Sequence, residues 1–542
     1  MSTTEVRESD HPYTHQASPG VRRFHLPLTL ASQRQHNRVG QITRLVIVSN
    51  RLPIVLHQSE GGAWCVEPGS GGLVTALTPV LRAREGIWIG WTGTSEAVDL
   101  DDLLTTDRER VGYKLQPVPL SEADVDGYYR GFANEIIWPL FHDVQTRCHF
   151  DPTYWAVYQD VNYKFAQVVA DNIAAGDYIW VQDYHLLLVA SYLREMEVEQ
   201  QLGFFLHTPF PSVDVFVKLP WRQQILEGLM AYDLLGFQTL RDRNNFLACA
   251  EALLHIDLPE LQPSVVTVAY GSRRIRVGHF AISIDFNEFD QLARTPEVVS
   301  RVKTLRDEIP DGNCLLGVDR LDYSKGIPER LEAFQCALER FPELCGNLTF
   351  VQVVVPSRAD ILEYQRLRTQ IEALVSRING QFSQPGWVPI HYLYRSLDRS
   401  ELVALYQAAD TALVTPLKDG MNLIAKEYCA ANFDCDGVLI LSEFAGAATQ
   451  LGQHALLVNP YDTYGVADAI YEACKMNPRE RRMRMGGLRQ IIRRQDIFRW
   501  LDTFLNVALA HDDDVANEAK RSAPASEHDY RQRRLSSAAS VY

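Results

Sequence analysis

The sequence lacks the marks of secreted, membrane-spanning and metal-clustered proteins. Its nine cysteines are scattered over 542 residues and form no CxxC pair. That pattern predicts reduced thiols in a cytoplasm rather than a disulfide framework or a metal cluster. No apolar run approaches the length of a membrane span, and the first residues contain no apolar segment of a secretory signal. We therefore expect a cytoplasmic protein with no membrane partner.

Further absences narrow the function. The formal net charge of −15 argues against general nucleic-acid binding. The glycine loop Gly69–Gly72 lacks the GxGxxG spacing of a dinucleotide site. Asp-x-Asp triplets occur at Asp99–Asp101, Asp124–Asp126 and Asp434–Asp436, but none follows a convincing strand. We predict no metal ion, no other cofactor and no nucleic-acid partner.

What the sequence does contain is a repeated α/β pattern. Its length suggests two or three domains, and its 46% hydrophobic content is enough for large cores. Helical segments alternate with short apolar runs, and the pattern restarts near residue 285. The predicted strands are Leu45–Ser49, Tyr178–Gln182, Leu202–Leu206, Cys314–Val318, Leu348–Val355, Ala412–Val414, Val438–Leu441 and Ala455–Val458. Such alternation predicts an α/β fold with two doubly wound, Rossmann-like domains facing across a cleft.

Composition also suggests where the domains begin and end. The polar residues 1–40 and 512–542 have few large apolar side chains, which predicts a mobile arm and a disordered tail. Between them we expect Rossmann-like domains at 41–284 and 285–490. The last helical stretch, from about Pro478 to Ala510, predicts a C-terminal helix over 491–511 that packs back toward the first domain.

The segment Thr415–Glu427 combines a strand end, a polar turn and a helix start. Backbone N–H groups at a helix start suit a phosphate, and Gly420 lets the backbone approach it. Asp419 and Glu427 stand eight residues apart, a little over two helical turns. Glu427 can then reach a ribose while Asp419 faces the group beyond the phosphates. The alternative is an ordinary strand-to-helix turn capped by an aspartate.

Two pairs of cations suggest two phosphate sites. Arg320 and Lys325 lie in one loop after a predicted strand, where they can neutralise a diphosphate together with the amides of Gly420–Leu423. Arg51 and Arg358 follow strands of different domains. Two arginines that meet only across a closed cleft can hold a second phosphate, on an acceptor.

Polar residues also follow two neighbouring strands of the first domain. Asp183 and His207 come directly after predicted strands, and ligands bind at that edge of an open parallel sheet. A lone histidine there is more often structural, but two such strand ends favour a site. The aromatic segment Tyr128–Trp138 has two interpretations: core packing, or rings that stack on a sugar.

Eight motifs between about 44 and 505 then resemble, in order, the retaining glycosyltransferases that make trehalose 6-phosphate. They are Ser49–Pro53, Gly71–Leu73, Trp88–Trp91, Trp138–His142, Asp183–His185, His207–Pro211, Arg320–Gly326 and Asp419–Leu423. That family has the two-domain GT-B fold. The sequence departs from the family's Pro-x-Gly-x-Asp at Ala281–Asp285, which puts nucleotide preference or loop position in doubt.

The resemblance implies a role for each site residue. The acceptor phosphate would be held by Arg51, Tyr129, Trp138 and Arg358. Trp91 would pack against the acceptor's sugar ring, and Asp183 would orient the acceptor's hydroxyls. The donor set would be Gly72, Arg320, Lys325, Gly420, Met421, Asn422, Leu423 and Glu427. The transferred glucose would lie against His207 and Asp419, which with Asp183, Arg320 and Lys325 form the catalytic set.

The resemblance implies transfer of glucose, with retention, from a nucleotide-glucose to glucose 6-phosphate. UDP-glucose is the expected donor, and GDP- and ADP-glucose stay open. The acceptor hydroxyl would attack from the face that the nucleotide leaves, while the protein stabilises charge. The alternatives are a glucosylglycerol-phosphate synthase or other change of acceptor, a non-catalytic sugar-phosphate sensor, and a PLP-dependent phosphorylase. A homo-oligomer and a separate downstream phosphatase are also expected.

Overall fold

The structure, a computed structural model, describes residues 44–58, 64–69, 72–83, 85–96, 112–258, 264–308, 312–358 and 361–510. The predicted mobile arm and disordered tail lie outside these ranges, as does the triplet Asp99–Asp101. Of the helices within the ranges, none has the length and apolar character needed to cross a bilayer.

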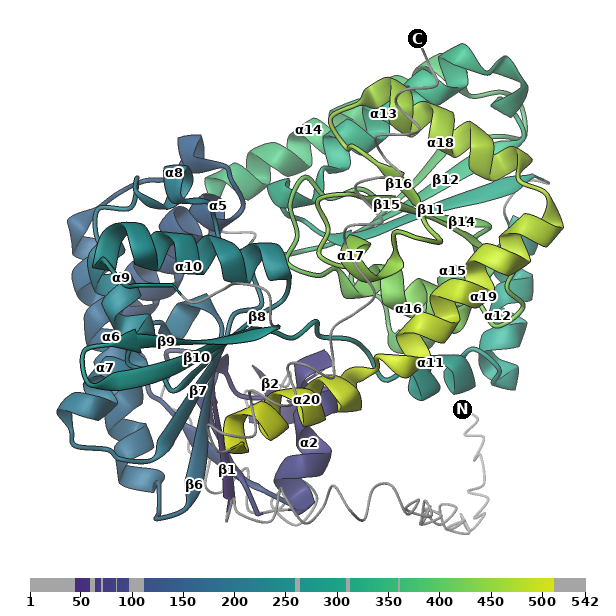
Figure 1. Ribbon diagram of the computed structural model, residues 1–542. Helices are drawn as coiled ribbons and strands as arrows, with labels where there is room; N and C mark the ends of the chain where they lie inside the picture. The colour runs from purple at the N-terminus through teal and green to yellow at the C-terminus, as the bar shows by residue number, and fades with distance from the viewer. Residues whose placement is uncertain are drawn as a thin grey trace, which may run out of the picture. The chain divides into compact units, whose positions relative to one another are not determined.

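The first half of the chain builds a sheet in the order β5-β4-β1-β6-β7-β8-β10-β9. Figure 1 labels its strands β1, β6, β7, β8, β9 and β10. Its strands are β1 Arg44–Arg51, β4 Ile87–Trp91, β5 Lys114–Pro117, β6 Asp177–Gln182, β7 Gln201–Phe205, β8 Leu234–Phe237, β9 Val265–Tyr270 and β10 Arg273–His279. All neighbours are parallel except β10 and β9. In chain order, strands β1 and β4 to β8 lie as 3-2-1-4-5-6, the order of a doubly wound sheet.

The second half builds a parallel sheet with the same doubly wound order. From edge to edge its strands are β13 Ile390–Tyr394, β12 Leu348–Val355, β11 Asn313–Arg320, β14 Thr411–Val414, β15 Val438–Ser442 and β16 Leu456–Val458. Strand β12 has the predicted bounds, and its first seven residues are buried, as expected for a strand covered on both faces. The predicted α/β class with two doubly wound sheets is confirmed, whereas the boundaries at 284 and 490 stay predictions.

Helices connect the strands of each sheet and supply the layers that bury them. In the first half they include α2 Gly72–Ala83, α6 Pro152–Asn172, α7 Val189–Glu195, α9 Arg222–Leu229 and α10 Leu240–Leu254. In the second half they include α11 Phe286–Leu292, α12 Pro296–Glu308, α13 Ile327–Arg340, α14 Leu362–Phe382, α15 Arg399–Ala408, α16 Leu423–Ala431, α17 Ala448–Leu451, α18 Thr463–Lys475 and α19 Pro478–Arg494.

The aromatic segment of the first half forms a π-helix, η2, over Val125–Ile137, followed by the short helix α5 Trp138–Phe141. Tight packing accompanies it, because a methyl group at Gly131 would lie 2.6 Å from the ring of Tyr154. Each backbone hydrogen bond of a π-helix spans one more residue than in an α-helix, so its turns are wider. This segment sets the positions of Tyr129 and Trp138 at the sheet edge.

The last helix crosses to the first sheet. The helical stretch predicted from Pro478 is interrupted after α19, and the predicted C-terminal helix begins later than residue 491. Asp496 caps this helix, α20 Ile497–Leu509, by accepting from the amide of Arg499 at 2.9 Å. Phe504 on α20 stacks on Trp180 of β6 with ring centroids 4.2 Å apart. Figure 1 shows α20 beside α2 and the first sheet. The second half thus completes the core of the first.

Candidate active site

Each sheet reverses its strand order at one point, and ligands of open α/β sheets bind outside the carboxyl ends of the strands there. In the first sheet the reversal lies between β1, which ends at Arg51, and β6, which Asp183 follows. In the second it lies between β11, which ends at Arg320, and β14, which leads into the turn at Asp419. The topology therefore collects the predicted site residues at two switch points.

Lys325 and Asp419 form a buried ion pair at the second switch point. The Lys325 Nζ lies 2.6 Å from the Asp419 Oδ2, and the two side chains are 12% and 13% exposed. Asp419 also accepts hydrogen bonds from the Met421 amide and the Asn422 Nδ2, both at 3.2 Å. Burial raises the pKa of Asp419, but Lys325 outweighs it and holds that pKa below its ordinary value. Asp419 is therefore ionised at neutral pH.

The turn after Asp419 starts helix α16 in the predicted way, with a different cap. Asn422, at φ 75°, accepts from the Ala425 amide through its side chain at 3.1 Å, so the cap is Asn422 and not Asp419. Leu423 begins the helix. The first amides of a helix have no partners within the helix, so the start of α16 suits a phosphate.

Glu427 lies on the helix that follows this turn, and Gly72 lies at the start of a helix of the first half. Glu427 lies on α16 and accepts a 2.8 Å hydrogen bond from the Tyr406 hydroxyl, while burial raises the pKa of its carboxyl. A half-buried carboxylate on the helix that starts at the turn fits the predicted ribose ligand. Gly72 is the first residue of α2, and Gly71 before it lies outside the described residues.

Arg320 is exposed at the end of β11. Its charge lowers the pKa of both Asp183, from the first half, and Asp322, from its own loop. The Arg320 charge is therefore close enough to act on carboxylates of both halves at the two switch points.

Asp183 is held in a strained backbone conformation at the end of β6. Its φ is 71°, in the left-handed region that non-glycine residues rarely adopt. The carboxylate accepts from the His207 amide at 3.2 Å. Burial raises the pKa of Asp183 to about 6, against the opposing effects of the Tyr184 and His207 amides and of Arg320. The carboxylate thus titrates just below neutral pH.

His207 is fixed by two glutamine side chains. Its Nε2 lies 3.0 Å from the Gln182 Oε1, and its Nδ1 lies 3.3 Å from the Gln238 Nε2. An amide nitrogen only donates, so Nδ1 accepts and Nε2 carries the proton. Burial lowers the pKa of His207 to about 4. The imidazole is therefore neutral and held in one tautomer at pH 7.

The predicted acceptor residues of the first half surround Arg51. The Arg51 guanidinium lies 4.8 Å from the ring of Trp91 and 5.7 Å from that of Tyr129. The two rings are 6.0 Å apart, and Tyr129 stacks on His185 at 5.9 Å. Arg51 is exposed, so a cation backed by aromatic faces is open to a phosphate.

Arg358 and Trp138 meet across the two halves. The Arg358 guanidinium lies 4.4 Å from the Trp138 ring, and at 3.5 Å it pairs with Asp322, which also accepts from the Trp138 Nε1 at 3.4 Å. Burial raises the pKa of Asp322, but Arg358 and Lys325 outweigh it and hold that pKa below its ordinary value. Burial lowers the pKa of Arg358, whereas Tyr184, Tyr364 and Asp322 raise it overall. Arg358 thus stays charged in a buried position.

The two predicted acceptor arginines converge on one place. Burial, with smaller contributions from Arg358 and Arg51, lowers the pKa of His185 to about 3. Both cations are therefore near the same imidazole, although they come from different sheets. The fold therefore brings together the two arginines predicted to bind the acceptor phosphate, although they lie far apart in the sequence.

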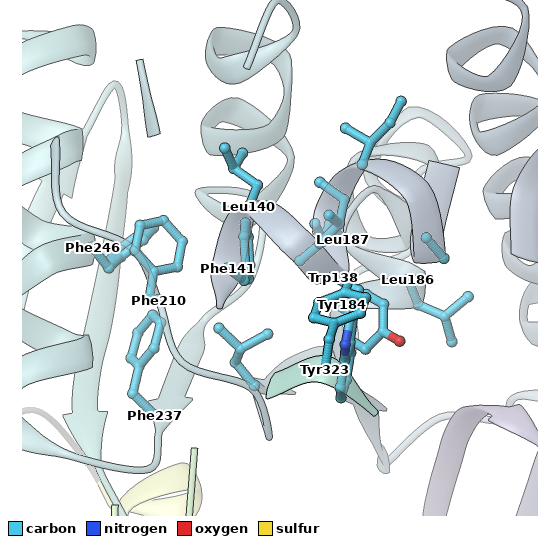
Figure 2. Close-up of a cluster of buried hydrophobic side chains, with 14 of the residues drawn as sticks. Trp138, Leu140, Phe141, Tyr184, Leu186, Leu187, Phe210, Phe237, Phe246 and Tyr323 are labelled. Carbon is cyan, nitrogen blue, oxygen red and sulfur yellow. The ribbon is translucent and has the colours of Figure 1, made fainter. Parts of the chain in front are cut away.

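Direct contacts join the two halves around this edge. A methyl group at Gly420 would lie 2.2 Å from the His207 carbonyl oxygen. Lys418 pairs with Asp143, and the Arg147 guanidinium lies 2.7 Å from Glu363. Figure 2 shows Tyr323 of the second half in a buried cluster with Trp138 and Tyr184 of the first. The halves are closed against each other in this structure.

Several side chains that build the site escaped the sequence analysis. Asp322 stands inside a quoted motif, between Arg320 and Lys325, so its position was a usable signal. Arg330, buried on α13, pairs with Asp319 and donates to the Lys325 carbonyl at 3.2 Å and to the Thr415 Oγ1 at 3.0 Å. An arginine inside a helix gives no such signal, yet this one ties the loop after β11 to the end of β14.

Within the described ranges, no group of three or more His, Cys, Asp or Glu side chains is placed to hold a metal ion. Members of the described Asp-x-Asp triplets pair with cations instead: Asp124 with Lys164, Asp126 with Arg130 and Asp436 with Arg482. These aspartates therefore serve ion pairs. Whether the reaction needs a metal stays a prediction.

Comparison with known proteins agrees with this geometry. The profile of Glycosyltransferase family 20 matches residues 43–509. A trehalose-6-phosphate synthase of Mycolicibacterium gilvum is 44% identical over 479 residues, which cover 88% of this chain and 95% of the relative.

Solved structures show the same fold. One from E. coli, bound with UDP-2-fluoro glucose, has a TM-score of 0.78 at 36% identity and covers 86% of this chain and 99% of its own. An alpha,alpha-trehalose-phosphate synthase from Burkholderia xenovorans, in complex with glucose-6-phosphate, has a TM-score of 0.77 at 34% identity, with 86% and 100% covered. The fold is therefore that of GT-B, as predicted, and the protein is a retaining glycosyltransferase. The chain belongs to glycosyltransferase family 20.

Proposed function

We propose that this protein transfers glucose from UDP-glucose to glucose 6-phosphate, with retention, and releases trehalose 6-phosphate and UDP. The observation that carries the proposal is the presence of two separate groups of cationic side chains where the two halves meet. Arg320 and Lys325 lie at the second switch point with the start of α16, and Arg51 and Arg358 converge near His185. One site suits a diphosphate and the other a phosphorylated acceptor.

The donor assignment rests on the turn at 419–423. Its amides and Lys325 would hold the diphosphate, Glu427 the ribose, and Asp419 and His207 the glucose. The E. coli structure bound with UDP-2-fluoro glucose supports a uridine nucleotide.

The acceptor assignment rests on Arg51 and Arg358 with the aromatic rings of Trp91, Tyr129 and Trp138. Three ring faces beside two arginines suit a pyranose that carries a phosphate, and the Burkholderia xenovorans complex with glucose-6-phosphate supports this choice. Glycerol phosphate offers no ring face, so a glucosylglycerol-phosphate synthase fits these walls less well.

Charge stabilisation by fixed groups is the proposed mechanism. As the sugar parts from UDP, Arg320 and Lys325 absorb the charge on the leaving phosphate. The acceptor hydroxyl, oriented by Asp183, attacks from that face and gives its proton to the departing oxygen. Preorganised cations of this kind stabilise a transition state because they need not reorient during the reaction, and contact between the halves excludes water from the donor.

A donor-by-acceptor panel with mass detection tests the function. We expect trehalose 6-phosphate and UDP only when UDP-glucose and glucose 6-phosphate are both present, and an α,α linkage by NMR. Glucosylglycerol phosphate as the main product would favour the change of acceptor. Binding of glucose 6-phosphate without release of any nucleoside diphosphate would favour a sensor.

Asp183→Asn should stabilise the protein while it slows the reaction. The pKa of Asp183 is raised to about 6, so its ionised form costs stability that develops as pH rises from the ordinary value toward 6. We expect the free energy of unfolding to rise by about 1–2 kcal/mol at pH 7, and the gain to vanish below about pH 4.

In the same variant kcat/KM for the acceptor should fall about 10²-fold, because the hydroxyl loses its anionic partner. Denaturant titration at several pH values and steady-state kinetics measure both effects. Unchanged acceptor kinetics would remove Asp183 from the reaction.

Three further properties are proposals on the same footing. A cytoplasmic location is testable by cell fractionation, and a homo-oligomer by light scattering of the purified protein. Removal of the phosphate from the product would fall to a separate phosphatase, so the purified protein should release no inorganic phosphate from trehalose 6-phosphate.

A further inference from the structure

Lys426 is a buried lysine whose described partners are all neutral. It lies on α16, directly before Glu427, and is 1% exposed. Its Nζ donates to the Ile282 carbonyl and to the Gln450 Oε1, both at 2.7 Å. Burial lowers the pKa of Lys426 to about 7. Burying a cation without a carboxylate destabilises the fold, and a methionine would fill the same space at no such cost. The position therefore calls for a reason beyond packing.

Ile282 lies in the segment that connects the two halves, between the end of β10 and the start of α11. Its carbonyl accepts from Lys426 of the second half, and its amide donates to the Gln238 Oε1 of the first half at 3.0 Å. Both backbone groups of this one residue are thus used, one by each half. Here the segment departs from the family pattern, and its Ser283 hydroxyl is buried without a hydrogen-bond partner among the described residues.

Gln238 completes a path to the reacting centre. It follows β8, is 1% exposed, and places its Nε2 3.3 Å from the Nδ1 of His207. The Gln238 side chain therefore binds the connecting segment through its oxygen and His207 through its nitrogen. The path runs from Lys426 through Ile282 and Gln238 to His207, with every step between 2.7 and 3.3 Å.

A third element braces the same segment. Gln450 on α17 is the second acceptor of Lys426, and its own side chain donates to the Gln495 Oε1 at 2.6 Å. Gln495 precedes α20, whose first amide, of Ile497, donates to the Ile284 carbonyl at 3.0 Å. The segment is therefore fixed from α16, from β8 and from the entry to α20.

The geometry points to Lys426 and Gln238 as positioning residues that set the ring orientation and tautomer of His207 through the segment connecting the two halves. The start of α16 is the proposed phosphate site. The position of α16 is then coupled to His207, the side chain proposed to lie against the donor glucose. This inference rests on the proposed function for its consequence in catalysis, and on the hydrogen bonds alone for its effect on His207.

Histidine NMR tests the effect on His207 without any turnover. Protein labelled with ¹⁵N-histidine is compared as wild type, Lys426→Met, Gln238→Leu and Gln238→Glu, with His207→Gln to assign the signal. Wild type should show one tautomer with the proton on Nε2 and no titration above pH 5. Glutamate at 238 still accepts from Ile282 but cannot donate to Nδ1, so Nδ1 must take a proton and the pKa of His207 should rise by more than one unit.

Arg489→Met is the matched control. Arg489 is also a buried cation that donates to the backbone of α16, at the Cys429 carbonyl 3.0 Å away and at the Ala430 carbonyl. It differs from Lys426 in that it also pairs with Asp290, and no described bond links it to His207. Arg489→Met also removes a buried donor from the backbone of α16, and it should leave the His207 signal unchanged. A wild-type His207 signal in both Lys426→Met and Gln238→Leu would overturn the inference.

Kinetics supply the second measurement. Lys426→Met and Gln238→Leu should lower kcat by about 10²-fold with KM for UDP-glucose within about threefold, since a displaced group costs the chemical step more than binding. Equal losses in Arg489→Met would reduce the effect to stability and contradict the coupling. If wild type itself turns over neither substrate, the proposed function fails, while the NMR comparison still decides the coupling.

Discussion

Gly420→Ala should abolish most of the activity through a single added methyl group. Gly420 is not among the residues with positive φ, so alanine suits its backbone. The obstacle is space, because the new Cβ would lie 2.2 Å from the His207 carbonyl oxygen and 3.1 Å from the carbonyl carbon of Thr208. Backbone stands on both sides of this contact, so it can be relieved only by separating the two halves. We expect kcat/KM to fall by 10²-fold or more, since separation of about 1 Å misplaces the donor from the acceptor.

The matched control is Gly486→Ala, in the middle of α19. A Cβ there meets nothing within 4 Å, so activity should be unchanged and the free energy of unfolding should rise by about 0.5–1 kcal/mol. Steady-state kinetics and denaturant titration measure both variants, and small-angle scattering shows whether Gly420→Ala is more open. Wild-type kcat in Gly420→Ala would mean that the halves need not touch here during the reaction.

Lys325→Met should lose activity and stability together. The ammonium would be missing from the leaving phosphate, for which we expect a loss of 10²–10³ in kcat. Asp419, 2.6 Å away and largely buried, would be left as an uncompensated charge, at a cost of about 3 kcal/mol. Kinetics and denaturant titration at pH 7 check the two effects.

The pH dependence separates the two effects. The pKa of Asp419 is held below its ordinary value, so its ionised form contributes stability above about pH 4 that is lost as pH falls through the lower folded value. The stability difference between wild type and Lys325→Met should therefore shrink in acid. Adding Asp419→Asn to Lys325→Met should restore stability but not turnover; a double variant as unstable as the single one would argue against the buried pair.

Much of this architecture was readable from the sequence because parallel strands and switch points depend on local patterns. The run Leu348–Val355 is apolar at nearly every position, and strand β12 has those bounds. Arg320 and Asp183 were found for the same reason, because each stands where an apolar run stops. The roles of the individual site residues remain predictions.

Other features depend on contacts that no local pattern encodes. Residues 125–137 form a π-helix, whose wider turns break the period that identifies helices. Gln238 and Lys426 were missed because an uncharged residue after a short strand, or a lysine in a helix, is ordinary until its distant partner is known. The helix predicted at the C-terminus was given too early a start, because Asp496 was not recognised as the N-cap of α20.

Because α20 packs on the first sheet, the core of the first half is completed only after the second half has been synthesised. The last strand of the first sheet ends at His279, but Phe504, which packs on Trp180 and Phe205, is added about 225 residues after His279. At about 5–20 residues per second, a ribosome leaves that aromatic surface bare for roughly 10–45 s. The amino-terminal half is therefore synthesised first, but its core is complete only after α20 has been made.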